Sequence, residues 1–201
     1  MKKTGKPPVA GNLPGFRKEA FLVLFCGRSL CCALCGSLGS FGGGSGISSF
    51  NRVAISGGTV TANGGDSSSN SGGYGISSLD VAISGGTVTA NGGDSKDGYG
   101  GDGIHSNGVT ISGGTVNAAG GYGGKVGGYG ICSFDRVAIS GGTVEAAGGN
   151  GSTGGGSGIY SSVIDLSGSL ELTAKAGSPT GKALLQNGRE LDQIGRASCR
   201  E

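Results

Sequence analysis

The chain has 201 residues, 49 of them glycine, and a formal net charge of +2. The sequence predicts no transmembrane segment, because no run reaches the ~18 apolar residues that a membrane-spanning helix needs. The positive charge belongs to the chain ends. Residues 41–172 hold four basic against nine acidic side chains, which gives −5. Because nucleic-acid affinity depends on neutralising phosphates, this acidic segment without a basic stripe excludes a nucleic-acid partner.

Residues 1–40 differ in kind from the remainder of the chain. The first 20 residues are basic, and the apolar stretches 20–26 and 30–34 come next. Two interpretations stay open, a secretory signal peptide and a mispredicted start of the protein. Four cysteines lie in this leader, but their spacing matches no familiar zinc pattern.

A 28-residue repeat dominates the chain after the leader. The hexapeptide Ile-Ser-Gly-Gly-Thr-Val begins at Ile55, Ile83, Ile111 and Ile139. A second anchor, Gly-Ile, recurs five times with spacings of 27–29 residues. A period of this size indicates supersecondary units that bury their apolar faces only against neighbouring units. Helix is excluded over 41–172, where glycine recurs and no apolar 3.6-residue period appears.

Each repeat contains three short, β-branched segments separated by turn residues, which predicts three strands per repeat. Strand alternation then places one set of side chains inside and the other outside. We therefore predict an all-β fold, a right-handed parallel β-helix of about five 28-residue coils over residues 41–175. Stacked coils should align like residues in inward columns: Ile47, Ile76, Ile104, Ile131, Ile159; Val53, Val81, Val109, Val137, Ile164; Ile55, Ile83, Ile111, Ile139, Leu166; and Val60, Val88, Val116, Val144, then Leu170 or Leu172.

The C-terminal residues divide into two parts. Residues 176–192 are interpreted as a degenerate further coil that is truncated. Residues 193–201 resemble a translated sequencing adapter, so we treat them as an artefact and expect the natural protein to continue past Asp192.

The loop from Asp94 to Asp102 is the candidate metal site. It contains Asp94, Asp97 and Asp102 among glycines, and calcium prefers six to eight oxygen ligands of this kind. The alternative is that these are solvated acids, since the other loops lack such acid density.

Tyrosines are the candidate ligand-binding residues. Tyr74 and Tyr129 both lie two residues before the isoleucine of Gly-Ile, and Tyr99 lies on a nearby loop. Aromatic rings along one edge could stack on sugar rings, while Asn and Asp bind the hydroxyls. The alternative is that these tyrosines pack locally over the corners of the coil.

The sequence offers no catalytic set. Its single histidine, His105, falls at the variable position after Gly-Ile, where alternation turns it toward solvent. Cys132 falls at the same position of the next coil and is interpreted as a tolerated substitution. Because general acid–base catalysis needs convergent partners, we predict that the protein is not an enzyme.

Residues 101–116, Gly-Asp-Gly-Ile-His-Ser-Asn-Gly-Val-Thr-Ile-Ser-Gly-Gly-Thr-Val, resemble the repeat of the carbohydrate-binding parallel β-helix family of bacterial cell-surface proteins. The resemblance implies a pectate-lyase-like fold, binding of acidic plant polysaccharides with calcium, and no lyase activity. The family pattern Asp-Asp-Gly-Ile-His-Ala-Asp matches Asp102 to His105 and places Asn107 at its last position. Gly101 replaces the first acid and Ser106 the alanine.

These observations predict non-catalytic binding of a polysaccharide or cell-surface glycan, at the bacterial cell surface or outside the cell. The candidate ligand-binding residues are Tyr74, Tyr99, Tyr129 and Asn107. One alternative is a structural stalk or adhesin repeat that displays another domain. A polysaccharide lyase is the third interpretation.

Overall fold

The computed structural model describes residues 21–24, 30–31 and 42–191. The predicted signal peptide or mispredicted start falls mostly outside these residues, and the adapter-like end falls outside them entirely. Within the leader, β1 (Phe21–Leu24) pairs in parallel with β4 (Arg52–Ile55), and β2 (Leu30–Cys31) pairs in parallel with β5 (Thr59–Asn63). No helix occurs in the described part of the chain, and hence none that could cross a membrane.

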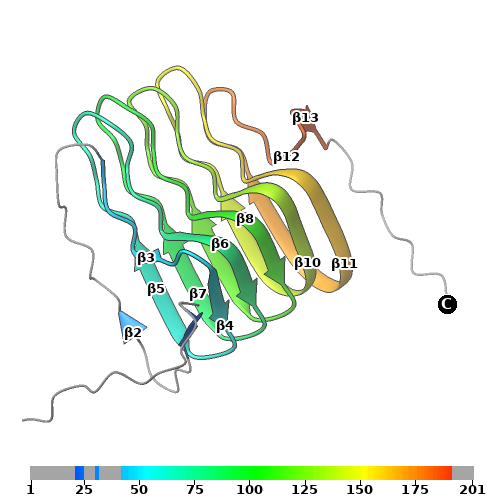
Figure 1. Cartoon of the computed structure of the whole chain (residues 1–201). Coiled ribbons are helices and arrows are strands. Elements are labelled where there is room, and N and C mark those ends of the chain that lie inside the picture. The colour runs from blue at the N-terminus through cyan, green and yellow to red at the C-terminus, as the bar shows by residue number, and fades with distance from the viewer. Residues whose placement is uncertain (1–20, 25–29, 32–41, 192–201) are drawn as a thin grey trace, which may run out of the picture.

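The fold is an all-β solenoid of about five turns with a spacing of about 28 residues, as predicted (Figure 1). Each coil contributes two sheet legs whose strands pair in parallel with those of the next coil. The two legs merge in the later coils into the long strands β10 and β11. The strands of the stack are β3 (Ile47–Ser48), β4 (Arg52–Ile55), β5 (Thr59–Asn63), β6 (Ile76–Ile83), β7 (Thr87–Asn91), β8 (Ile104–Ile111), β9 (Thr115–Ala119), β10 (Ile131–Ala147) and β11 (Ile159–Lys175).

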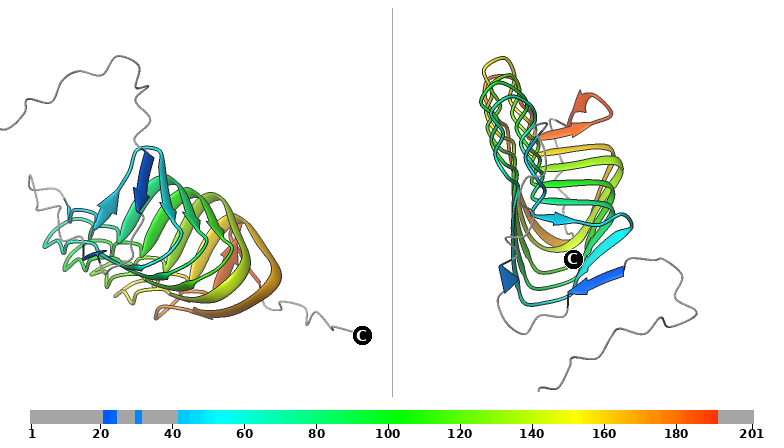
Figure 2. Two further views of the ribbon diagram at one scale, coloured as in Figure 1. Left: turned by 90° about the horizontal axis from the view of Figure 1, so that it is seen from below. Right: turned by 60° about the vertical axis from the view of Figure 1, so that its left-hand side comes forward.

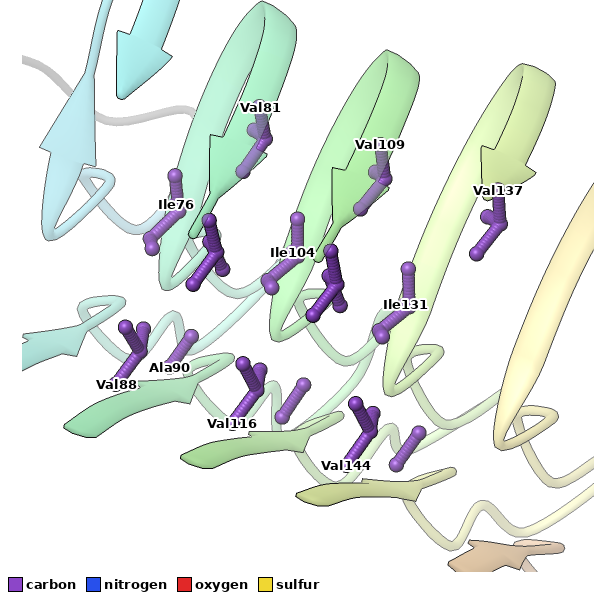
Figure 3. Close-up of a cluster of buried hydrophobic side chains, with 14 of the residues drawn as sticks. Ile76, Val81, Val88, Ala90, Ile104, Val109, Val116, Ile131, Val137 and Val144 are labelled. Carbon is purple, nitrogen blue, oxygen red and sulfur yellow. The ribbon is translucent and has the colours of Figure 1, made fainter. Parts of the chain in front are cut away.

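The core consists of the predicted columns of isoleucine and valine. Ile76, Ile104 and Ile131 are register partners in successive coils, and all three are fully buried. Figure 3 shows these side chains and the valines pointing into the space between the two legs. On the opposite face of β7, Thr87 is exposed and Thr89 is partly exposed. The alternation expected for a strand with one buried face therefore holds.

The last full coil continues the columns with weaker burial. Ile164, Leu166 and Leu172 pair with Val137, Ile139 and Val144, so Leu172 rather than Leu170 extends the fourth column. These side chains are only partly buried. Residues 176–191 then add β12 (Leu184–Gln186), which pairs in parallel with β11, and β13 (Arg189–Glu190), which folds back antiparallel.

The glycines have two distinct roles. The second glycine of each Ser-Gly-Gly-Thr turn has a positive φ, for example +85° at Gly86, which disfavours a residue with a Cβ. The glycine pairs of the loops instead allow two backbones to touch. Segments 64–75, 92–103, 120–130 and 148–158 form a narrow stack beside the strands, which we call the glycine extension (upper left in the right-hand view of Figure 2).

Backbone atoms fill the interior of the glycine extension. The amide of Gly101 donates to the carbonyl of Gly93 (2.9 Å), and the amide of Gly121 donates to the carbonyl of Gly101 (2.8 Å). A Cβ on Gly101 would clash with the carbonyl of Gly73 in the preceding coil. The outgoing and returning halves of each loop, which form the two walls of the extension, thus bond through their main chains.

Candidate functional site

Two outward columns beside the Gly-Ile anchor differ from coil to coil. The residue before Gly-Ile is aligned between coils by backbone hydrogen bonds, such as that from Gly75 to the carbonyl of Asp102. The residue after Gly-Ile is aligned by strand pairing. The first column reads Ser45, Tyr74, Asp102, Tyr129, Ser157, and the second reads Ser48, Ser77, His105, Cys132, Tyr160. Side chains of different chemistry therefore stack at one strand spacing on a repeated scaffold.

A cavity of 330 Å³ lies along the first column. Three successive coils each contribute two side chains three residues apart, and glycine backbone lies between them. We call this cavity the tyrosine groove. Its lining residues are Ser71, Tyr74, Tyr99, Gly100, Asp102, Val126, Gly127, Gly128 and Tyr129.

The tyrosine groove is bounded by small residues. In the preceding coil the two lining positions hold Gly42 and Ser45, and in the following coil they hold Gly154 and Ser157. The walls therefore span three coils, or roughly 10 Å between the outer two at about 4.8 Å per coil.

Asp102 is the buried carboxylate of the site. Its Oδ1 accepts a hydrogen bond from the Tyr129 amide (2.7 Å), and its Oδ2 lies 2.7 Å from Nδ1 of His105. The His105 ring stacks on Tyr74 with 4.1 Å between ring centroids, and Phe134 packs edge-on at 5.2 Å. The solvent-facing His105 expected from the sequence is therefore corrected: the imidazole is half-buried among three partners, because Asp102 and Tyr74 lie within its reach.

Cys132 lies directly beside this pair. It is the register partner of His105 on the adjacent strand and is 3% exposed. Ligand atoms of Asp102, His105 and Cys132 all lie within 4.8 Å of one another. Burial, with a smaller contribution from Asp102, raises the pKa of the Cys132 thiol well above its usual range. The thiol is therefore neutral at physiological pH and is a poor nucleophile.

The pKa values of two groove tyrosines are also shifted by their surroundings. Burial is the largest cause that raises the pKa of both Tyr74 and Tyr129, and nearby Asp102 adds to it. Both phenols therefore stay protonated at physiological pH and can donate hydrogen bonds. Tyr129 stacks on Tyr160 with 5.1 Å between ring centroids, whereas Tyr99 is 54% exposed.

The structure brings the three candidate tyrosines together but not Asn107. Tyr74, Tyr99 and Tyr129 line one groove with Asp102. Asn107 is exposed on β8 and is not among the lining residues, and its main-chain carbonyl accepts a hydrogen bond from Ser133. We therefore keep the three tyrosines as candidate binding residues and add Asp102, which the sequence suggested only as a calcium ligand.

The three candidate calcium ligands are not brought together. Asp94 and Asp97 are exposed, and Asp94 accepts a hydrogen bond from the Tyr122 amide of the next coil (2.7 Å). Within the described residues, the cluster of carboxylate, imidazole and thiol groups in ligating range contains Asp102 with His105 and Cys132 instead. Calcium in the 94–102 loop stays a prediction from sequence, and this geometry does not support it.

Sequence reasoning missed the association of His105 with Cys132. The signal was present, because both residues come directly after Gly-Ile in successive coils. Parallel stacking places such residues about 4.8 Å apart. Repeat position, rather than proximity along the chain, would have identified the cluster.

The fold and the groove define a class of protein, a parallel β-solenoid with an aromatic groove on its outer surface. Comparisons with protein-family models, curated proteins and solved structures found no match to this chain. The resemblance of residues 101–116 to a carbohydrate-binding family therefore rests on the repeat itself.

Proposed function

We propose that this protein is a non-catalytic carbohydrate-binding solenoid whose tyrosine groove holds a short segment of a polysaccharide. The observation that carries the proposal is the convergence of Tyr74, Tyr99, Tyr129 and the Asp102 carboxylate on one cavity. Its volume of 330 Å³ is at the lower end of the roughly 300–1,000 Å³ typical of small-molecule sites.

The chemistry of the groove fits a sugar chain. Aromatic faces pack against the C–H faces of sugar rings, and polar groups at the ring edge bind hydroxyls. Asp102 can accept hydrogen bonds from hydroxyls, and the protonated phenols of Tyr74 and Tyr129 can donate to ring oxygens. The bounded length of the groove suits a few sugar rings rather than a long chain.

Charge favours a neutral glycan. Residues 41–172 carry −5, and the groove has its own buried carboxylate. Like charges repel an acidic polysaccharide unless a cation lies between them. We therefore propose a neutral polysaccharide as the first partner to test, and a location at the bacterial cell surface or outside the cell, where such polymers are accessible.

Glycan-array screening of the full chain, followed by calorimetry, tests the proposal. Tyr99→Ala should weaken binding at least about tenfold, because an exposed stacking ring is lost without disturbing the core. Tyr122→Ala is the matched control, since Tyr122 is a 45% exposed tyrosine that does not line the groove. No binding to any neutral glycan, or equal effects of the two substitutions, would contradict the proposal.

A structural stalk is the second candidate function. The uniform register of the coils supports it, since stacked repeats make rigid, extended spacers. A folded chain that binds no glycan on the array would favour the stalk over the binding module.

We propose no lyase or hydrolase activity. His105 lies outside the lining of the groove, and its Nδ1 is engaged by Asp102. Incubation with pectin, xylan and β-glucan should release no unsaturated or reducing sugars. Turnover that disappears in His105→Ser would restore the lyase interpretation.

A further inference from the structure

The geometry points to a transition-metal site formed by Asp102, His105 and Cys132, with zinc as the metal whose ligand preferences it fits best. The inference does not rest on glycan binding, although Asp102 belongs to both sites. Three side chains supply one oxygen, one nitrogen and one sulfur donor, all within 4.8 Å of one another.

The donor set selects the metal. Calcium and magnesium take oxygen ligands, whereas a thiolate and an imidazole together favour zinc or the neighbouring first-row metals. Zinc–ligand distances of about 2.0–2.3 Å place tetrahedral ligand atoms roughly 3.3–3.8 Å apart. The 2.7 Å contact between Asp102 and His105 therefore opens slightly when a metal binds, and all three ligand atoms already lie within 4.8 Å of one another.

The surroundings hold two of the ligands in place. The Tyr129 amide fixes the second oxygen of Asp102, and the rings of Tyr74 and Phe134 confine His105. Orientation by such neighbouring groups is a general feature of protein metal sites. Asp102 and Cys132 are both more than nine-tenths buried, so the ligands lie in a protected place.

No permanently charged cation pairs with the buried carboxylate among the described residues. Among the described residues, the ion pair of Asp102 is with His105, which is charged only when protonated. A divalent cation would compensate the carboxylate and stabilise the thiolate beside it. Because Asp102 lines the tyrosine groove, a fourth coordination position is left for water or for a hydroxyl of a bound ligand.

Cobalt spectroscopy on the full chain tests this inference. Cys26, Cys31, Cys32, Cys35 and Cys199 are first replaced by serine, so that Cys132 is the single thiol. Titration with Co²⁺ alone should give one equivalent of binding and a thiolate-to-cobalt charge-transfer band. Zn²⁺ should displace the cobalt and raise the melting temperature of the protein.

The repeats themselves provide conservative variants. Cys132→Ser and His105→Ser introduce the residue found at the same position in the coil with Ser77, so the fold should persist. Each should weaken metal binding at least about tenfold, and Cys132→Ser should remove the charge-transfer band. Tyr160→Ser, at the same position one coil further, should retain both.

Three outcomes would overturn the inference. The first is no cobalt binding at millimolar concentration by the folded protein. The second is a charge-transfer band that persists in Cys132→Ser. The third is stoichiometric binding that is unchanged in both ligand variants, which would indicate adventitious surface sites. None of these outcomes bears on the glycan proposal, because the titrations contain no sugar.

Discussion

Ile111 and Thr110 are neighbours on β8 that face opposite sides of the strand. Ile111 is fully buried in the isoleucine column, while Thr110 is exposed. Ile111→Asp should lower the free energy of unfolding by about 3–5 kcal/mol, because it leaves an unpaired charge in an apolar stack. Thr110→Asp should change it by less than about 0.5 kcal/mol. Urea unfolding followed by circular dichroism measures both, and comparable losses would contradict the assigned register.

The ionisation of two groove tyrosines provides a second test of the burial of single residues. Since burial raises the pKa of Tyr74 and Tyr129, their tyrosinate absorbance should appear above pH 10. Because the folded pKa is raised, the protonated phenols stabilise the folded state. This stabilisation is fully present below the unfolded pKa of about 10 and is lost as the pH rises through the folded pKa. Tyr74→Phe should remove the corresponding part of the titration. A variant spectrum that loses absorbance below pH 10 instead would show that the ring is solvated.

The inward positions could be predicted residue by residue, since a strand with one buried face has a period of two. Ile83 and Val88 illustrate this, and both are buried as expected. The residues of the candidate site were harder to predict from the sequence. Asp94, Asp97 and Asp102 are close along the chain, but a solenoid brings together residues one repeat apart. Cys132 and His105 are separated by 27 positions in sequence and are adjacent in space.

At the scale of the element, the glycine extension was the part that sequence reasoning explained least. Glycine permits either a tight corner or a close approach of two backbones, and Gly86 is such a corner. The pairs at Gly93 and Gly101 are the close approach, where two main chains contact each other. A backbone-to-backbone interface leaves no apolar periodicity in the sequence, so its partner segments could not be assigned.

The glycine extension makes a sharp prediction about alanine. Gly101→Ala should destabilise the protein by about 3 kcal/mol or more, because the new methyl group would meet the carbonyl of Gly73, which cannot move independently. Gly57→Ala is the control, because a Cβ at Gly57 meets nothing within 4 Å. Its effect should be neutral or slightly stabilising, since alanine restricts the unfolded chain.

Thermal melting of the two variants beside the parent protein provides the measurement. If Gly101→Ala and Gly57→Ala melt at the same temperature, the close approach of Gly101 to the carbonyl of Gly73 is contradicted.

The whole molecule is stabilised by contacts between neighbouring coils, so its stability should vary along the stack. Strands β7, β8 and β9 have a coil on each side and fully buried columns, whereas Ile164, Leu166 and Leu172 of β11 are only partly buried. Hydrogen–deuterium exchange read by mass spectrometry should show the slowest exchange in β7 to β9 and faster exchange in the second half of β11. Uniform protection along the chain would instead indicate a single all-or-none unit.

Each coil of the groove contributes one pair of lining side chains, and this regularity affects how such a protein can diversify. Near-identical repeats favour unequal recombination, which inserts or removes whole 28-residue units without altering the register of the others. An event within the three groove coils would add or delete one pair of lining side chains and change the length of the groove by about 4.8 Å. The length of ligand recognised would then change in integer steps with copy number, while point mutations at the two outward columns would change its chemistry. Selection could act on these two properties separately, because neither requires the buried columns to be repacked.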